Sequence, residues 1–380
     1  ALVTDVAGNY KEFNQSATAT KIDTTRPTVA SATSSDASGL YGVGDILNLE
    51  ITFDDTVSLT DGTGSLNLDV GIGIPFLPTD LDSLSSIDLS YQVESGHSST
   101  DLTVNNITAS GGFIRDLAGN NMNVFTVTDG ANLADNKDIE IDGIYPSDFM
   151  VDTVVTTGGT LNSLYWNSTN TGLELMVGIA NDLSLIDGYV QLRGRVNDGD
   201  YENVGSEESI LNGFLNDTIT FSLTASEVEN MTGFGEDVVI DFSAIIADKA
   251  GNQWNGTPGN ETDLIVDQTA PADGGIEALT SLGGNILNGY FNSTNTGLLI
   301  SVNISKTDTS LAGGSAQMQM KTVGDFATID TAFVIELTDV DAGFVDVQID
   351  ADSIKAWSDY LDGRTIFFRS ILTDVAGNEL

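Results

Sequence analysis

The sequence predicts an all-β chain of tandem antiparallel β-sandwich domains arranged end to end. Three observations predict this class. Short runs alternate apolar and polar residues, several markers repeat with a spacing near 125 residues, and 380 residues suffice for three domains of about 100 residues each plus connections. Helical periodicity is scarce, and the two best candidates, 225–230 and 352–360, are short.

The strands are predicted from alternation, because successive side chains of a strand point to opposite faces of its sheet. Leu47-Asn48-Leu49-Glu50-Ile51-Thr52-Phe53 shows this pattern well. Dipeptides such as Asp61-Gly62 and Asp198-Gly199 separate the runs and are typical of turns. The remaining runs of this kind cover residues 66–70, 87–93, 175–179, 189–196 and 218–223.

An internal repeat divides the chain into units. The segment Tyr165-Trp166-Asn167-Ser168-Thr169-Asn170-Thr171-Gly172-Leu173 recurs 125 residues later, with Phe291 in place of Trp166, at 290–298. A second marker, Asp-x-Ala-Gly-Asn, occurs at 5–9, 116–120, 248–252 and 374–378. After each of the first three copies comes an apolar residue, an Asp and, four residues after that Asp, a proline, at 22–27, 141–146 and 266–271.

The prolines mark the predicted boundaries, since proline stiffens a linker and cannot continue a strand ladder. We therefore predict domains at 28–146, 147–271 and 272–380, the last without its closing strand. Residues 1–27 carry the C-terminal strands of a preceding domain, and we expect the chain to be a window of a longer array. In an alternative interpretation, residues 1–27 are an exchanged strand that completes the open third domain of a neighbouring copy, which would build a filament.

The composition excludes several classes of function. A formal charge of −43 would repel nucleic acid phosphates and anionic lipid, and no segment is apolar and long enough to enter a membrane. With no cysteine and without a nucleophile elbow, phosphate loop or zinc-protease motif, we predict that the chain is not an enzyme. Packing such acidic domains end to end requires bound cations or salt, and we expect Ca²⁺ as the cofactor.

The glycine turns and their junctions resemble those of bacterial and archaeal Ig-like repeats in giant adhesins and S-layer-type surface proteins. Asp248-Lys249-Ala250-Gly251-Asn252 followed by Val266-Asp267-Gln268-Thr269-Ala270-Pro271 carries the resemblance, which extends over the whole chain. The junction at 141–146 lacks the usual threonine. The resemblance implies Ig-like domains and an extracellular, cell-surface location, with other copies or adjacent repeats as partners.

Two interpretations of the glycine turn remain open. In the first, glycine supplies a positive φ and the Asp and Asn side chains bond their own backbone, so the motif is purely structural. In the second, the turn and the junction Asp that follows it hold calcium between domains, pairing Asp5 with Asp23, Asp116 with Asp142 and Asp248 with Asp267. The candidate metal ligands are Asp5, Asn9, Asp23, Asp116, Asn120, Asp142, Asp248, Asn252, Asp267, Asp374 and Asn378.

Asn-x-Ser/Thr acceptors make the chain a candidate glycoprotein, although abundant Asn and Thr in turns would produce many by composition. They lie at Asn14, Asn106, Asn167, Asn216, Asn230, Asn255, Asn260, Asn292 and Asn303. The expected function is a rigid, calcium-braced array in a cell-surface layer or filament. The alternatives are the stalk of a calcium-dependent adhesin and a carbohydrate-binding module that contacts a surface glycan.

Overall fold

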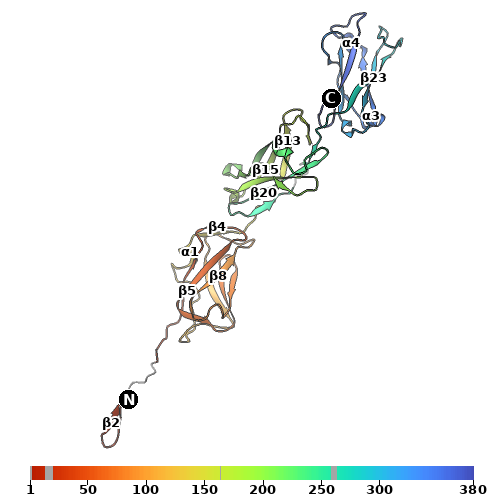
Figure 1. The fold of residues 1–380 in the computed structure, drawn as a ribbon. Coiled ribbons are helices and arrows are strands. Elements are labelled where there is room, and N and C mark those ends of the chain that lie inside the picture. The colour runs from red at the N-terminus through yellow and green to blue at the C-terminus, as the bar shows by residue number, and fades with distance from the viewer. Residues whose placement is uncertain (1, 13–19, 163, 258–262) are drawn as a thin grey trace. The chain divides into compact units, whose positions relative to one another are not determined.

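The computed structural model describes residues 2–12, 20–162, 164–257 and 263–380 (Figure 1). About 45% of the chain is strand and 8% helix, arranged in several mainly antiparallel sheets, so the prediction of an all-β chain of sandwiches is confirmed. The chain divides into two compact units, residues 1–145 with 250–252, and residues 146–249 with 253–380. Three separate hydrophobic cores lie within them, one in the first unit and two in the second.

Sandwich 1, in the first unit, has its core between Val29 and Ile141. Its longest strand, β5 (Ile46–Leu59), buries Leu47, Leu49 and Ile51 on one face, as the alternation predicts. One sheet contains β3 (Val29–Ser34), β5, β8 (Leu84–Gln92) and β11 (Ile114–Asp116). The others contain β6 (Thr63–Leu68), β7 (Gly73–Phe76) and β10 (Val104–Ser110), and β4 (Gly39–Tyr41), β9 (Ser98–Ser99) and β12 (Ile139–Asp142).

The same unit holds a short hairpin and one helix. Strands β1 (Leu2–Thr4) and β2 (Tyr10–Glu12) pair antiparallel around the first glycine turn. Helix α1 (Leu133–Asn136) is capped by the side chain of Asn132 and precedes β12. Because α1 has only four residues, it serves as a connection rather than as a layer of the fold.

Sandwich 2, in the second unit, has its core between Val151 and Val266. One sheet consists of β13 (Val151–Thr157), β15 (Gly172–Gly178) and β19 (Thr218–Thr224), which the helix α2 (Ala225–Glu229) follows. The other is built around β16 (Tyr189–Val196) and β20 (Val239–Ala247) and includes the short β17 (Glu202–Asn203), β18 (Glu208–Ser209) and β21 (Gln253–Asn255). Strand β22 (Leu264–Val266) closes this sheet between β20 and the parallel β14 (Tyr165–Trp166).

Sandwich 3, also in the second unit, repeats this order. The strands β23 (Asp273–Leu282), β24 (Gly297–Ile304) and β28 (Phe344–Asp350) correspond to β13, β15 and β19. Strand β25 (Ser315–Lys321) pairs with β26 (Ala327–Thr328), β27 (Phe333–Val334) and β29 (Phe367–Thr373), which matches β16 and its neighbours. In the described part of sandwich 3, no strand corresponds to β14 or β22.

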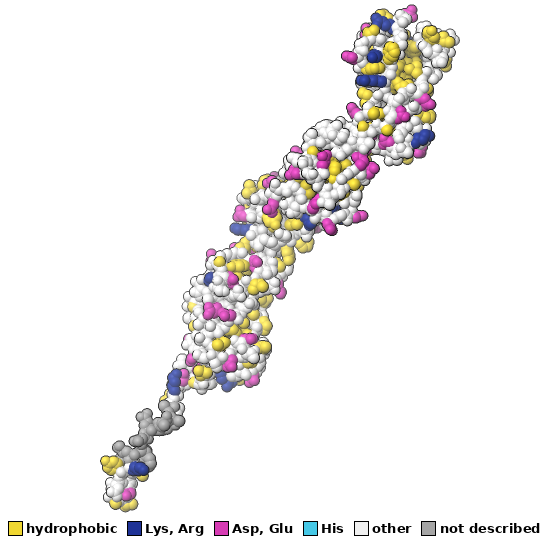
Figure 2. Space-filling model, in the orientation of Figure 1, with side chains coloured by type: hydrophobic (Ala, Val, Ile, Leu, Met, Phe, Trp, Pro, Cys, Tyr) yellow, Lys and Arg dark blue, Asp and Glu magenta, His cyan; other side chains and the backbone are white. Residues whose placement is uncertain are grey.

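The remaining helical segments are short and lie between strands. They are α3 (Leu337–Ala342), α4 (Ala351–Lys355), and the 3-10 turns η1 (Leu183–Leu185), η2 (Asn212–Phe214) and η3 (Thr309–Leu311). Among the described residues no helix has the length and apolar character needed to cross a membrane. Acidic side chains are spread over the visible surface of each sandwich (Figure 2), in line with the 56 acidic and 13 basic residues of the sequence.

Candidate functional site: the glycine turns and their junctions

The Asp-x-Ala-Gly-Asn segment forms the same turn in every copy. Its glycine has a φ of +79° at Gly8, +94° at Gly119, +86° at Gly251 and +94° at Gly377, a conformation that other residues adopt at a cost. The Asn side chain donates to the Asp carboxylate, from Asn9 to Asp5 (3.1 Å), Asn120 to Asp116 (2.7 Å) and Asn378 to Asp374 (3.0 Å). These bonds form the turn as the structural interpretation of the motif requires.

The turn also contacts a junction residue, but a different one from that predicted. Asn120 Nδ2 donates to the carbonyl of Asp23 at 3.4 Å, and Asn378 Nδ2 donates to that of Asp267 at 2.8 Å. Within the first unit, Asn252 Nδ2 donates in the same way to the carbonyl of Asp142 at 2.9 Å.

The predicted pairing of each turn with the junction Asp that follows it is therefore wrong for Asp116, whose turn meets Asp23, and for Asp267, which meets the turn of Asp374. The physical reason is the course of the strands. The strand before each turn returns to the end of the sandwich at which the chain enters, so the turn meets the preceding junction. Asp5 and Asn9 lie in an exposed hairpin, where among the described residues no bond joins them to Asp23.

Sandwiches 2 and 3 are joined by a buried set of polar contacts around Asn378, which is 1% exposed. Its Nδ2 donates to the carbonyl of Asp267, and its Oδ1 accepts from both the amide (3.1 Å) and the Oγ (2.9 Å) of Ser168. Asn167, which is fully buried, donates to the carbonyl of Ala376 at 2.7 Å. The repeated Asn-Ser-Thr-Asn-Thr-Gly segment of sandwich 2 is thus the receptor for the glycine turn of sandwich 3.

This junction gathers acidic groups away from water. Burial, the charge of Asp374 and the charge of Glu236 raise the pKa of Asp267 to about 7. Burial also raises the pKa of Asp374, although the Asn378 side chain and backbone amides donate to it. The pKa of Glu236 is lowered despite its burial, since the amides of Gln268 and Thr269 donate to its carboxylate. The carboxyl group of Asp267 therefore ionises less readily than one in water.

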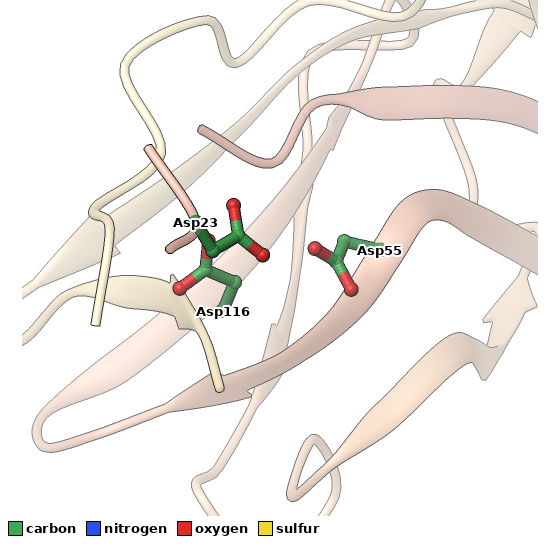
Figure 3. A group of neighbouring side chains, drawn as sticks. All are labelled: Asp23, Asp55 and Asp116. Carbon is green, nitrogen blue, oxygen red and sulfur yellow. The ribbon is translucent and has the colours of Figure 1, made fainter. Parts of the chain in front are cut away.

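A second acidic group lies in sandwich 1, where Asp23, Asp55 and Asp116 point toward one another (Figure 3). One carboxylate oxygen from each lies within 4.8 Å of the others. Asp116 is buried, Asp23 is half-buried and Asp55 is exposed. Asn120 lowers the pKa of Asp116 by donating its side-chain amide to the carboxylate, which keeps this buried group charged.

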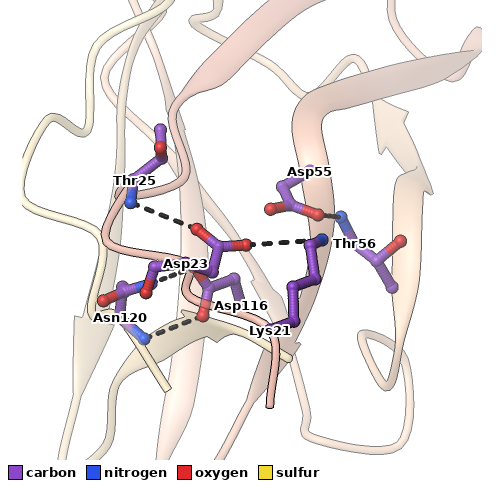
Figure 4. Close-up of polar contacts among 7 residues, drawn as sticks. All are labelled: Lys21, Asp23, Thr25, Asp55, Thr56, Asp116 and Asn120. Atoms are coloured by element: carbon purple, nitrogen blue, oxygen red, sulfur yellow. Dashed lines mark hydrogen bonds and ion pairs between the residues drawn. The ribbon is translucent and has the colours of Figure 1, made fainter. Parts of the chain in front are cut away.

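The contacts around these three carboxylates leave their charge largely uncompensated (Figure 4). Backbone amides donate to Asp23 from Thr25 (3.2 Å) and to Asp55 from Thr56 (2.7 Å). Lys21 Nζ lies 3.9 Å from Asp23, but its side chain is 90% exposed. Converging carboxylate oxygens are the kind of ligand that a hard dication such as Ca²⁺ prefers, and Asp23 and Asp55 have fewer hydrogen-bond donors than Asp116.

Sequence reasoning missed Asp55, Glu236 and Ser168. For Asp55 a signal was present, because Asp54-Asp55 interrupts the alternation of β5, and the pairing of β5 with β8 shifts register between Thr52 and Val57. That irregularity places Asp55 opposite the glycine turn. Ser168 lies within the repeated segment 165–173, but the repeat does not reveal its bond to Asn378, which only the packing of sandwich 3 against sandwich 2 creates. Glu236 occurs in an ordinary loop sequence, and its role follows from its place beside Asp267.

The predicted glycosylation sites fall in three environments. Asn216, Asn230 and Asn255 are exposed, whereas Asn106, Asn292 and Asn303 are half-buried. Asn167 cannot carry a glycan in this structure, because its Nδ2 is buried and donates to two carbonyls. Its acceptor pattern reflects the receptor segment instead. Asn14 and Asn260 lie outside the described residues.

The fold and this junction define a protein of several β-sandwiches in which polar side chains join sandwiches 2 and 3. No protein-family model matches the chain, and no curated protein matches it. Activated α-2-macroglobulin of Escherichia coli is a solved structure similar to it at 6% identity and a TM-score of 0.22, with 92% of this chain and 30% of that one covered. Dimeric latent PorU of Porphyromonas gingivalis is similar at 8% identity and a TM-score of 0.17, with 93% of this chain and 33% of that one covered. The chain thus spans about a third of each.

Proposed function

We propose that this chain is a non-enzymatic structural element of an extracellular surface layer, filament or stalk, in which successive sandwiches are held stiffly by their glycine turns. The observation that carries the proposal is the buried contact of Asn378 with Asp267 and Ser168. A flexible linker would leave these polar groups in water. Burying them in satisfied bonds ties sandwich 3 to sandwich 2, since each broken bond would leave a buried group without a partner.

The resemblance to Ig-like surface repeats supports a cell-surface location. The charge of −43 supports a role for cations, which would reduce the repulsion between packed acidic domains. The carbohydrate-binding alternative is less well supported, since it needs exposed aromatic rings. Trp166 is fully buried in sandwich 2, and Trp254 is 41% exposed.

Stiffness can be measured directly because the chain has no cysteine. Spin labels at Ser222→Cys and Gln348→Cys, both exposed strand positions, report the distance between sandwiches 2 and 3. We expect a single narrow distance distribution that Asn378→Ala broadens. A broad distribution in the otherwise unchanged chain would contradict the proposal.

Calcium is expected to bind at Asp23, Asp55 and Asp116 and to stabilise sandwich 1. At a free concentration of 100 times the dissociation constant, binding to the folded state alone adds about 2.7 kcal/mol to the free energy of unfolding. We expect Asp55→Asn to weaken calcium binding by about tenfold or more, since it removes one of three carboxylates. Titration calorimetry and thermal unfolding, each with and without chelator, would measure both effects.

The matched control is Asp88→Asn, which removes the same charge from an exposed position of β8. It should leave calcium affinity unchanged apart from a small long-range effect. Equal losses of calcium affinity in Asp55→Asn and Asp88→Asn would show that calcium screens the general surface charge and has no site at the three aspartates.

A further inference from the structure

One sheet of sandwich 2 carries an ionic cluster with its own carboxylate on the outward face. Arg193 and Arg195 lie over the ring of Tyr201, with their guanidinium carbons 5.6 and 4.7 Å from its centroid. Asp241 accepts from Nε of Arg195 at 3.0 Å and from the hydroxyl of Tyr201 at 2.6 Å. The Asp241 carboxylate therefore compensates the charge of Arg195 within the same face.

The corresponding face of sandwich 3 has lost this carboxylate. In the strand register of sandwich 2, Arg195 lies opposite Asp241. The residues 126 positions later, Lys321 and Phe367, lie opposite each other in sandwich 3. Alternate residues of β25 are buried, which places Lys321 on the outward face. Phe367, which is 50% exposed, thus stands where sandwich 2 has its anion.

Two cations of sandwich 3 share one aromatic ring and have no counter-ion. Nζ of Lys321 and the guanidinium carbon of Arg369 lie 4.4 and 4.8 Å from the centroid of Phe326. Nε of Arg369 donates to Oε1 of Gln319 at 2.7 Å, which is a neutral acceptor. Among the described residues no ion pair joins Lys321 or Arg369 to a carboxylate. This cationic face therefore fits a partner that supplies carboxylates.

Sandwich 1 has an outward face with the opposite property. Glu50 of β5 and Asp88 of β8 lie directly opposite each other in the strand register. The Cβ atoms of such a pair are about 4.5–5.5 Å apart, and like charges at this position destabilise a sheet. Neither carboxylate has a hydrogen bond or an ion pair with the described residues. No other register of the described strands sets two carboxylates opposite each other.

The side chains around this acidic pair are short. Thr33, Thr52, Ser86 and Ser90 occupy the neighbouring outward positions of β3, β5 and β8. A sheet face lined by such residues allows a second sheet to approach. The longer Lys and Arg side chains of that second sheet would then reach the two carboxylates.

We propose that the cationic face at Lys321 and Arg369 of one copy binds the acidic face at Glu50 and Asp88 of a second copy, sheet against sheet. This inference rests on the proposed structural function and names the partner. Each pair of like charges gains the counter-ions that its own chain does not supply. The general repulsion between acidic copies is screened beyond about 8 Å at physiological salt, whereas the paired charges lie in contact. Since every copy offers one face of each kind, the contact is heterologous and joins many copies.

Charge reversal tests this contact on the full chain, with chelator present so that calcium cannot bridge the copies. Lys321→Glu with Arg369→Glu makes the cationic face acidic. Glu50→Lys with Asp88→Lys makes the acidic face basic. We expect light scattering at about 0.15 M salt to show oligomers of the original chain, and each doubly substituted chain alone to associate about tenfold or more weakly. A mixture of the two should associate again, because every acidic face then meets a basic one.

Matched controls place the same changes of charge at other exposed positions of the same sandwiches. They are Lys355→Glu with Arg364→Glu in sandwich 3, and Asp101→Lys with Asp129→Lys in sandwich 1. Both should associate as the original chain does, and circular dichroism should show unchanged folding of all four variants. If net charge alone governed association, the chain with the reversed acidic face would associate more strongly than the original. That result would overturn the proposal.

Zero-length cross-linking examines the chain without any substitution. A carbodiimide takes up water as it joins a lysine amine to a carboxylate in contact with it. An equal mixture of isotope-labelled and unlabelled chain distinguishes links between copies from links within one copy. We expect mass spectrometry to find Lys321 of one copy joined to Glu50 or Asp88 of the other. Links from Lys321 only to other carboxylates would contradict the proposed register of the two faces.

An acidic glycan is the other occupant that the cationic face could take. If polygalacturonate bound the original chain but not the chain with the reversed cationic face, and the original chain stayed monomeric at all concentrations, the second copy would not be the occupant and the proposal would fail. The proposed function is tested separately, because the spin-label distance between sandwiches 2 and 3 is measured within one chain.

Discussion

Asn378→Ala is expected to lower the free energy of unfolding of sandwich 3 by about 2–4 kcal/mol and to loosen its contact with sandwich 2. The variant removes a donor to Asp267 and Asp374 and an acceptor for Ser168, all at a buried position. Denaturant unfolding would measure the total change in the free energy of unfolding. Hydrogen exchange of amides in β29 and in the receptor segment would locate it at the junction.

The matched control is Asn9→Ala in the hairpin between β1 and β2. Asn9 makes the same bond to Asp5 that Asn378 makes to Asp374, but its turn is exposed, and no hydrogen bond links it to a sandwich among the described residues. We expect Asn9→Ala to lower the free energy of unfolding by less than about 0.5 kcal/mol. If both variants lowered the free energy of unfolding equally, the turn itself would be the source of the stability, and the junction would contribute nothing.

The second large effect is a dependence of junction stability on pH. The pKa of Asp267 is raised from 3.8 to about 7 in the folded chain, so the folded state holds this proton more tightly than the unfolded state does. The resulting stabilisation is fully present below about pH 4 and is lost as the pH rises through 7. The raised pKa of Asp374 acts in the same direction, and the lowered pKa of Glu236 opposes it. We expect a net loss on the order of 2 kcal/mol between pH 5 and 8.

Asp267→Asn isolates this effect, because the amide keeps the shape and the acceptor oxygen of the carboxyl group but cannot ionise. Measured with chelator present, the variant should be more stable than the original chain at pH 8, and the difference should shrink toward pH 4. Glu174→Gln, an exposed position on β15, is the control and should leave the pH profile unchanged. A steep profile that persists in Asp267→Asn would assign the dependence to other groups.

Much of the fold followed from local pattern. The predicted strand at 189–196 coincides with β16, and the predicted helix at 225–230 with α2 to within one residue. Alternation determines these elements because one face of each strand must be buried. The glycine turn was equally predictable from the sequence, since its Gly needs a positive φ and its Asp and Asn side chains bond each other within five residues.

The junctions were less predictable. The sequence marked Asp23, Asp116 and Asp267 as candidates but assigned them the wrong partners, because spacing along the chain does not say at which end of a sandwich a turn lies. Asp55 enters the group from the middle of a long strand through a register shift. The acceptor pattern at Asn167 predicted a glycan, yet the side chain is buried under the next sandwich.

The sequence by itself determined the class, the repeat of about 125 residues and the geometry of the glycine turn, because each of these depends on contacts between near neighbours in the chain. Only the tertiary structure decided which junction each turn meets and which acidic groups converge. Those features depend on the direction in which each strand crosses its sandwich, and no local pattern contains that direction.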